Sequence, residues 1–336
     1  MDGNSKKRKR FWEPSPREAR RSPLTSNRVH SLFQGRPETH EIARPEPPLD
    51  IQPETFPDGI RELHSCSDAI LDICFIHGLR GNRETTWTAA GQFEPWPGML
   101  LPQKLANVRV LTYGYDASVV NGSLNRLIDH AENLLIDLSA DREGVGAESR
   151  PLIFVAHSLG GLVCKKALLL SRNKPEKHLQ SVFHHTKGFI FMGTPHRGSW
   201  MAEWASVPAR LLGLTMSTNK SLLDVLKPDD QLLESLQINF WNMIRQLRDE
   251  GRTIEITCAY EELPLTGFSG LRTLVVSKKS ATQEGYSSFS IHANHWEMAR
   301  FSSMEDAGFK RLLGDLRRWT KHVEKANAGE EGAPQY

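Results

Sequence analysis

The sequence predicts an α/β fold, a mostly parallel sheet with helices on both faces. Seven strand-like runs between about residues 59 and 277 alternate with helical patterns, the order that a parallel sheet requires. Residues 152–156 are five consecutive apolar residues, as in a strand that is buried on both faces. Residues 123–138 carry one apolar stripe at helical spacing and a charged opposite face. A chain of 336 residues suits one large domain of this kind.

Residues 1–55 differ in composition from the rest of the chain, and we expect them to be disordered. Nine of the 19 prolines precede residue 60, and aliphatic residues are few. Such a segment cannot bury enough apolar surface to offset the entropy of ordering it. Its basic run KKRKR (6–10) suits a nuclear address or an anionic surface, although such runs are often neither. We expect the folded domain at residues 56–322 and a second disordered tail at residues 323–336.

An apolar strand within residues 69–81 ends in His77-Gly78-Leu79. Glycine permits a sharp turn that points the next backbone N–H inward, so the N–H of Leu79 is a candidate donor to an oxyanion. A histidine at a strand end usually hydrogen-bonds to backbone groups and orients its loop. We therefore expect a structural role for His77.

Ser158 stands between the run 152–156 and a helical pattern that begins at Leu159. The flanking Ala156 and Gly160 are small, as a tight strand-to-helix turn with an exposed serine hydroxyl requires. The helix start also aims backbone N–H groups, that of Leu159 included, at the same point. The pattern predicts a nucleophilic serine on an α/β-hydrolase fold, and a plain turn is the alternative that this motif alone leaves open.

Residues 199–250 are too long for a simple connection between strands and carry helical patterns of their own. They predict a helical cap insertion, whose apolar stripe either packs on the core or walls a substrate pocket. His196, just before it, is expected to be a core or loop-ordering residue. His178, His184 and His185 lack metal-ligand spacing, so a wet connecting loop is expected there, and neither a metal nor another cofactor is predicted.

The remaining catalytic groups should follow in the order acid, then histidine. Glu261 and Glu262 come directly after the strand-like run 253–260, where the acid loop belongs, although two glutamates also suit a solvated loop. His295 and its rival His292 follow the strand-like run 273–277 and precede a terminal helical pattern. The residues alone leave both choices open.

The ordered motifs together are more specific than any one of them. They are FIHGLRG, TW, LTYGYDA, VAHSLGG, GTPHRGS and NHWEMARF. Over about residues 59–318 the chain resembles the fungal serine-active-site, lipase-like α/β-hydrolases, similar to the serine-active-site protein of mitochondrial phospholipid remodelling. The resemblance implies that His295 is the base, that Glu261 is the acid and that GTPHRGS lines the site.

The final motif of that family usually reads DHSxMxKF, and this chain departs from it. Asn294, Trp296 and Arg300 replace the aspartate, the serine and the lysine, while the histidine remains. The bulkier Trp296 beside the base is expected to narrow the site. The departure therefore bears on the range of substrates more than on the triad.

The sequence as a whole predicts a serine hydrolase that cleaves carboxylic esters of lipids or other apolar acyl groups. Ser158 is the expected nucleophile, His295 the base and Glu261 the orienting acid, with the N–H groups of Leu79 and Leu159 as oxyanion donors. The alternative is a hydrolase-like signalling or protein-interaction module, because related fungal domains occur fused to nucleotide-binding repeat proteins.

Charge and composition bound the partners and the compartment. A formal net charge of +2 gives no general attraction to nucleic acid, so the expected partner is a small-molecule ester or a lipid, with peripheral membrane contact. The charged start lacks the apolar core of a secretory signal, and four cysteines without metal spacing suit a reducing compartment. We expect an intracellular protein, cytoplasmic or nuclear, with mitochondrion or endoplasmic reticulum as the alternatives that the resemblance implies.

Overall fold

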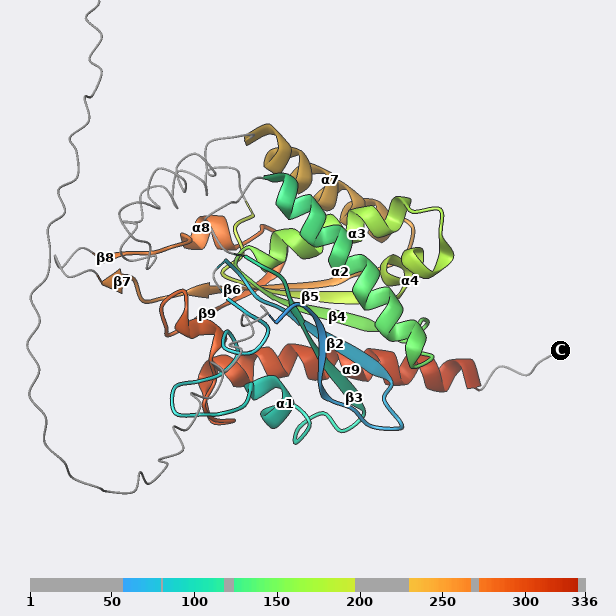
Figure 1. Ribbon diagram of the computed structural model, residues 1–336, viewed down its shortest axis with the longest axis horizontal. Helices are drawn as coiled ribbons and strands as arrows, with labels where there is room; N and C mark the ends of the chain where they lie inside the picture. The colour runs from blue at the N-terminus through green and yellow to red at the C-terminus, as the bar shows by residue number, and fades with distance from the viewer. Residues whose placement is uncertain (1–56, 80, 118–123, 197–229, 267–271, 332–336) are drawn as a thin grey trace, which may run out of the picture. The chain divides into compact units, whose positions relative to one another are not determined.

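A seven-stranded sheet crosses the domain (Figure 1). The computed structural model describes residues 57–331 apart from residue 80 and residues 118–123, 197–229 and 267–271. The strand order is β1-β3-β2-β4-β5-β6-β9; β1 runs antiparallel to β3, and the other neighbouring pairs are parallel. The strands are β1 (Gly59–His64), β2 (Leu71–Ile76), β3 (Val108–Gly114), β4 (Leu152–His157), β5 (Thr186–Met192), β6 (Glu255–Glu261) and β9 (Ser287–Ile291), with a separate pair β7 (Leu265–Thr266) and β8 (Arg272–Thr273). The predicted mostly parallel sheet is confirmed.

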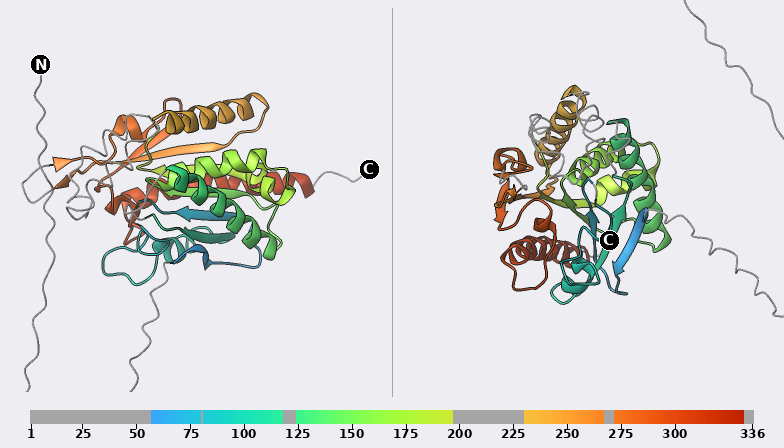
Figure 2. Two further views of the ribbon diagram at one scale, coloured as in Figure 1. Left: turned by 45° about the horizontal axis from the view of Figure 1, so that its top comes forward. Right: turned by 60° about the vertical axis from the view of Figure 1, so that its left-hand side comes forward.

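Helices cover both faces of the sheet (Figures 1 and 2). One face carries α2 (Leu124–Gly144), α3 (Gly160–Asn173), α4 (Lys177–His185) and α7 (Asp230–Asp249), and the other carries α1 (Trp96–Leu100) and α9 (Ala307–Glu331). Strand β2 shows how the two cores arise. Cys74 and Ile76 belong to the core under α2 and α3, whereas Ile73 and Phe75 belong to the core under α9. Successive side chains of a strand point to opposite faces, so an all-apolar strand must be covered twice.

The predicted strand at residues 273–277 is wrong. β8 ends at Thr273, and the chain turns through two buried valines into the short helix α8 (Lys278–Ala281). The last strand of the sheet is β9, whose sequence SSFSI has little apolar character. β9 lies at the edge of the sheet and is only partly covered, so it needs fewer apolar residues than a central strand.

The predicted unstructured tail at residues 323–336 is wrong for residues 323–331, because α9 continues through Glu331. Val323 is 5% exposed and extends the buried face that runs from Phe309 to Trp319. Trp319 lies so close to Gly188 of β5 that a Cβ there would be 2.8 Å from its ring. The buried residues up to Val323 therefore stabilise the helix, and the exposed residues 324–328, whose sequence looks like a tail, continue it. Residues 332–336 and the whole predicted N-terminal tail, with its basic run, lie outside the described residues.

The predicted wet loop that contains His178, His184 and His185 is instead the helix α4. Leu179, Val182 and Phe183 of this helix are buried in the core that it shares with α3. The three histidines lie on a short amphipathic helix whose apolar residues were too few to show a clear period in the sequence.

Helix α7 is the described part of the predicted cap insertion, and residues 197–229 lie outside the described residues. Leu236, Phe240 and Ile244 of α7 are buried in the same core as α3. Of the two alternatives for this apolar stripe, packing on the core is therefore the observed one. In the described part of the chain, no helix combines the length and the apolar character needed to cross a membrane.

Candidate active site

Ser158 stands in the turn between the carboxyl end of β4 and the start of α3. Its φ of 53° is the only positive φ of a non-glycine residue in the described segments. This backbone conformation costs on the order of 1–3 kcal/mol, so the surroundings must enforce it. The residues that follow are closely packed: a Cβ on Gly160 would lie 2.3 Å from the carbonyl oxygen of His77, and a Cβ on Gly161 would lie 2.2 Å from Oγ1 of Thr194. The predicted small residue Gly160 is thus a steric requirement of the elbow.

Replacement of Gly160 by alanine tests this packing. The added methyl group would lie 2.3 Å and 2.6 Å from two backbone oxygens of the β2 end, which cannot move without displacing the strand. We expect a loss of about 1–3 kcal/mol in the free energy of unfolding, measured by urea denaturation. Gly144→Ala at the end of α2 is the matched control, since nothing lies within 4 Å of its added Cβ. Equal stability of the two variants would contradict the steric argument.

Three of the predicted site residues form one hydrogen-bonded chain. Oγ of Ser158 lies 3.0 Å from Nε2 of His295, and Nδ1 of His295 lies 2.7 Å from Oε2 of Glu261. All three side chains are buried. In the tautomer that satisfies both bonds, the serine hydroxyl donates to Nε2 and the Nδ1–H donates to the carboxylate. The imidazole is therefore placed to accept the serine proton while the carboxylate stabilises the resulting cation.

The carboxylate of Glu261 is held by backbone groups as well as by the histidine. Its Oε1 accepts hydrogen bonds from the N–H groups of Val275 at 2.5 Å and Val276 at 3.1 Å. These two residues belong to the segment that was predicted as a strand. Backbone donors fix the carboxylate plane and leave Oε2 for the imidazole. Sequence reasoning missed them, because a backbone N–H leaves no trace in the residue type.

The rival residues Glu262 and His292 pair with each other at the surface. Oε2 of Glu262 lies 2.8 Å from Nδ1 of His292, whose side chain is 79% exposed. Hydrogen bonds from Ser290 and His292 lower the pKa of Glu262. Glu261 is the last residue of β6, and the alternation of side chains along a strand sends its neighbour to the opposite side. The structure thus brings Glu261 and His295 to Ser158, and it brings neither Glu262 nor His292 there.

The surroundings of His295 explain two features of the sequence motifs. Gly193 has a φ of 60°, and a Cβ there would lie 3.0 Å from Cε1 of His295, so only glycine suits this position beside the imidazole. Oδ1 of Asn294 accepts the N–H groups of Trp296 and Glu297 and begins the 3₁₀ turn Glu297–Ala299. The asparagine that replaces the family aspartate therefore caps this turn. The Trp296 ring meets the imidazole edge-on at 5.1 Å.

The loop that precedes the elbow is ordered by His77, as predicted. Nδ1–H of His77 donates to the carbonyl of Gly78 at 2.9 Å, and Nε2 accepts from the N–H of Tyr115 at 3.2 Å. Burial lowers the pKa of His77 to about 4, so the ring is neutral. A planar trans peptide points its N–H opposite to its C=O, and holding the Gly78 carbonyl therefore fixes the direction of the Leu79 N–H. A Cβ on Gly78 would lie 2.6 Å from Cβ of Ser158, so this loop touches the serine.

Thr194 supports the elbow and was missed by sequence reasoning. Its hydroxyl donates to the carbonyl of Ser158 at 3.0 Å. The resemblance of its segment GTPHRGS to site-lining segments was the one hint in the sequence. His196 of the same segment lies in the core, as predicted, and its Nδ1 is 2.7 Å from Nζ of Lys165. Burial lowers the pKa of Lys165 well below its usual range.

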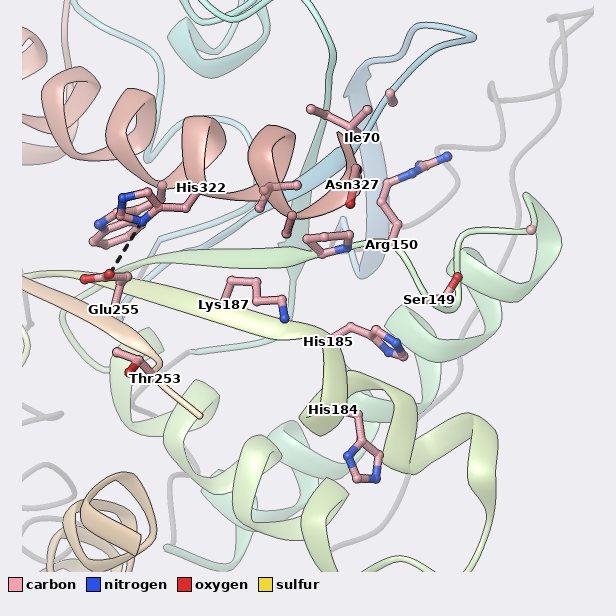
Figure 3. Close-up of a pocket in the computed structure, with 16 residues that line it drawn as sticks. Ile70, Ser149, Arg150, His184, His185, Lys187, Thr253, Glu255, His322 and Asn327 are labelled. Carbon is pink, nitrogen blue, oxygen red and sulfur yellow. Dashed lines mark ion pairs between the residues drawn. The ribbon is translucent and has the colours of Figure 1, made fainter. Parts of the chain in front are cut away.

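A hollow of about 850 Å³ lies at the amino ends of the central strands, away from Ser158 (Figure 3). Its lining includes Arg150, Lys187 and Glu255, which stand at the amino ends of β4, β5 and β6. Ser158 and His295 come after the carboxyl ends of β4 and β9, and Glu261 is the last residue of β6. The amino and carboxyl ends of parallel strands lie at opposite ends of the sheet, so this hollow is separate from Ser158, Glu261 and His295. Among the described residues, no group of three or more histidine, cysteine, aspartate or glutamate side chains is placed to hold a metal ion.

The α/β-hydrolase class is defined by a mostly parallel sheet with a strained serine turn after a central strand. In this class an acidic residue and then a histidine follow at the ends of later strands, as Glu261 and His295 do here. Residues 73–222 match the family model described as "Putative serine esterase (DUF676)". The chain is similar to Protein SERAC1 of Danio rerio, with 27% identity over 287 residues, and to that of Homo sapiens, with 26% over 289 residues. Each alignment covers 79% of this chain and 42% of the relative, so the chain spans about two fifths of the length of these relatives. The predicted resemblance to serine-active-site hydrolases is confirmed.

Solved structures of esterases and lipases are similar at low identity. The mature lipase BlEst2 of Bacillus licheniformis has 18% identity and a TM-score of 0.45, and covers 76% of this chain and 97% of its own. Esterase B of Lactobacillus Rhamnosis has 13% identity and a TM-score of 0.45, and covers 83% of this chain and 91% of its own. Carboxyl esterase 2 of Tuber melanosporum has 15% identity and a TM-score of 0.44, and covers 82% of this chain and 89% of its own.

Proposed function

We propose that this chain is a serine hydrolase that cleaves carboxylic esters through an acyl-enzyme. The observation that carries the proposal is the buried hydrogen-bonded chain from Ser158 through His295 to Glu261. A serine hydroxyl is a weak nucleophile by itself, and an adjacent base that is oriented by a carboxylate activates it. The serine-esterase family model matched by residues 73–222 supports the same class of reaction.

In the proposed mechanism Oγ of Ser158 attacks the ester carbonyl while Nε2 of His295 accepts its proton. The N–H groups of Leu79 and Leu159 hold the oxyanion. The alkoxide then leaves with the proton from His295, and the acyl group stays on the serine. Water attacks the acyl-enzyme with His295 again as base, which releases the carboxylic acid and restores the serine. Glu261 orients the imidazole and stabilises its cation without taking the proton.

We further propose that the substrate carries an apolar acyl chain, as a lipid does. Leu159 directly follows the reacting serine, Leu79 follows Gly78, whose Cβ would lie 2.6 Å from that of Ser158, and the Trp296 ring lies 5.1 Å from the imidazole of His295. The two leucines and Trp296 are partly buried side chains that pack on the core beneath the site. Apolar walls with a few polar groups at the reacting atoms are typical of sites for apolar ligands.

A fluorophosphonate probe and a series of p-nitrophenyl esters from acetate to palmitate test this function. We expect covalent labelling at Ser158 and turnover that rises from acetate toward medium-length chains, because burial of each CH₂ contributes about 0.8 kcal/mol. Absence of both labelling and turnover in a folded protein would favour the alternative, a hydrolase-like interaction module. Fastest turnover on acetate would contradict the apolar acyl site.

Replacement of Glu261 by glutamine is expected to lower kcat by up to about 10⁴-fold, by analogy with other triads. The amide keeps the shape of the side chain but loses the charge that stabilises the imidazolium. Glu262→Gln is the matched control on the adjacent residue, and its exposed pair with His292 predicts little change in kcat. Steady-state kinetics on p-nitrophenyl butyrate distinguish the two variants. A larger loss in Glu262→Gln would show that the acid is assigned to the wrong residue.

A further inference from the structure

We propose that His157 is a positioning residue that fastens the backbone of the catalytic base to the strand that carries the nucleophile. This inference rests on the proposed function, because it concerns the alignment of the same site. His157 is the last residue of β4 and directly precedes Ser158. Nothing in the roles of the nucleophile, the base or the acid requires a histidine at this position.

The first observation is a buried hydrogen bond to the backbone of the base. Nε2 of His157 lies 2.8 Å from the carbonyl oxygen of His295, and the two imidazole rings are 4.9 Å apart. A carbonyl oxygen only accepts, so Nε2 carries the hydrogen and donates it. His157 is 2% exposed and His295 is fully buried. A hydrogen bond therefore joins the backbone carbonyl of His295 to His157, the residue next to Ser158, although Ser158 and His295 are 137 positions apart in the sequence.

The second observation is the packing of the other side of the ring. Nδ1 of His157 is buried without a hydrogen-bond partner in the described structure. A Cβ on Gly78 would lie 3.1 Å from this nitrogen, so the ring fills the space between the Gly78 loop and the His295 loop. A buried nitrogen without a partner costs free energy, which a purely apolar filler such as phenylalanine would avoid. The histidine is thus explained by its donor on the opposite side.

The charge state of the ring agrees with this role. Burial, with His295 as the next contribution, lowers the pKa of His157 well below its usual range. A neutral ring keeps a second positive charge away from His295 when that residue takes the serine proton. A ring that stays neutral can donate from Nε2 to the His295 carbonyl without exchanging a proton, so it suits a role in holding the backbone and not one in proton transfer.

The consequence for catalysis is alignment. Misplacement of a catalytic group by about 1 Å can cost about 100-fold in rate. The His157 donor fixes the carbonyl of His295, and the Glu261 carboxylate fixes its Nδ1. Two restraints on opposite parts of one residue leave its Nε2 directed at Oγ of Ser158. Loss of the first restraint should lower kcat and leave the binding of the ester largely unchanged.

His157→Phe and His157→Gln test the proposal. Phenylalanine fills the same space without a donor, and we expect kcat to fall about 10- to 100-fold with KM within about threefold of wild type. The side-chain amide of glutamine can donate from nearly the position of Nε2, and we expect it to restore kcat to within about fivefold of wild type. If the phenylalanine variant does not fold, His157→Met takes its place.

Two controls separate positioning from general loss of stability. His292→Phe removes an exposed histidine from the same loop and is expected to leave kcat unchanged. Leu316→Ala empties part of the core under α9 and should cost about 2–5 kcal/mol in stability while kcat is retained. The proposal is overturned if His157→Phe keeps the wild-type kcat, or if His157→Gln is as slow as His157→Phe.

A readout without turnover distinguishes failure of this proposal from failure of the proposed function. The proton on Nδ1 of His295, held by Glu261, should give a low-field proton resonance in the NMR spectrum of the wild-type protein and of His157→Gln. We expect it to be broadened or lost in His157→Phe. A wild-type protein with this resonance but without ester turnover would refute the proposed function alone. An unchanged resonance in His157→Phe would refute the positioning role.

Discussion

Replacement of Ser158 by alanine is expected to lower kcat by about 10⁶-fold, the largest effect that we predict. The change removes Oγ, which makes the 3.0 Å contact with His295 and which we propose as the attacking atom. Little packing is lost with one hydroxyl, and alanine meets the same strain as serine at a φ of 53°. The folded protein should therefore persist, with Tm lowered by no more than about 4 °C.

The measurement combines ester kinetics, fluorophosphonate labelling and thermal unfolding on the same preparation. Ser139→Ala is the matched control, because Ser139 is also buried and its Oγ donates to the carbonyl of His178 at 2.9 Å on the helical layer away from the site. It loses one hydroxyl and one hydrogen bond, as Ser158→Ala does, and should keep both labelling and turnover. Retained turnover in Ser158→Ala would refute the proposed mechanism.

Replacement of His295 by alanine is expected to be nearly as severe, on the order of 10⁶-fold in kcat. The imidazole links the serine to the carboxylate, and without it neither proton removal nor protonation of the leaving alkoxide has a group within reach. The fluorophosphonate reaction should slow in parallel, because it needs the same activated serine. KM should change much less than kcat.

His292→Ala provides the comparison, since this histidine precedes His295 by three residues and is exposed. We expect a change in kcat of less than about twofold, because only a surface ion pair with Glu262 is lost. Steady-state kinetics at equal protein concentration measure kcat of both variants. Their Tm values show whether a loss of activity comes from a loss of folded protein. A severe His292→Ala together with a mild His295→Ala would reassign the base.

The elbow shows what adjacent residues can determine. Ser158, Ala156 and Gly160 are close in the sequence, and small residues on both sides of a serine indicate a tight turn by their type alone, although the atoms that Gly160 must avoid belong to His77 and Ile76. The loop at His77 is of the same kind, because the histidine binds the carbonyl of the next residue. Both interpretations could be made without knowledge of the tertiary structure.

The C-terminal part of the sheet shows where local patterns are insufficient. The run 273–277 is apolar because Val275 and Val276 are buried beside Glu261, and β9 is a strand although its sequence is mostly serine. Burial makes residues apolar whether or not they form a strand, whereas an edge strand needs only a neighbour with free backbone groups. The apolar run 273–277 therefore resembled a strand, although it is mostly a buried turn.

The sequence by itself determined the class of fold, because alternating apolar runs indicate strands and helices. It also determined the order of the chemical groups, because that order is the order of the residues along the chain. Only the tertiary structure decided which glutamate and which histidine face Ser158, since residues alone left both pairs open. Glu261 and Glu262 are adjacent, and the direction of one strand residue separates a buried partner of His295 from an exposed partner of His292. That direction depends on pairing of β6 with β5 and β9, which joins segments far apart in the chain.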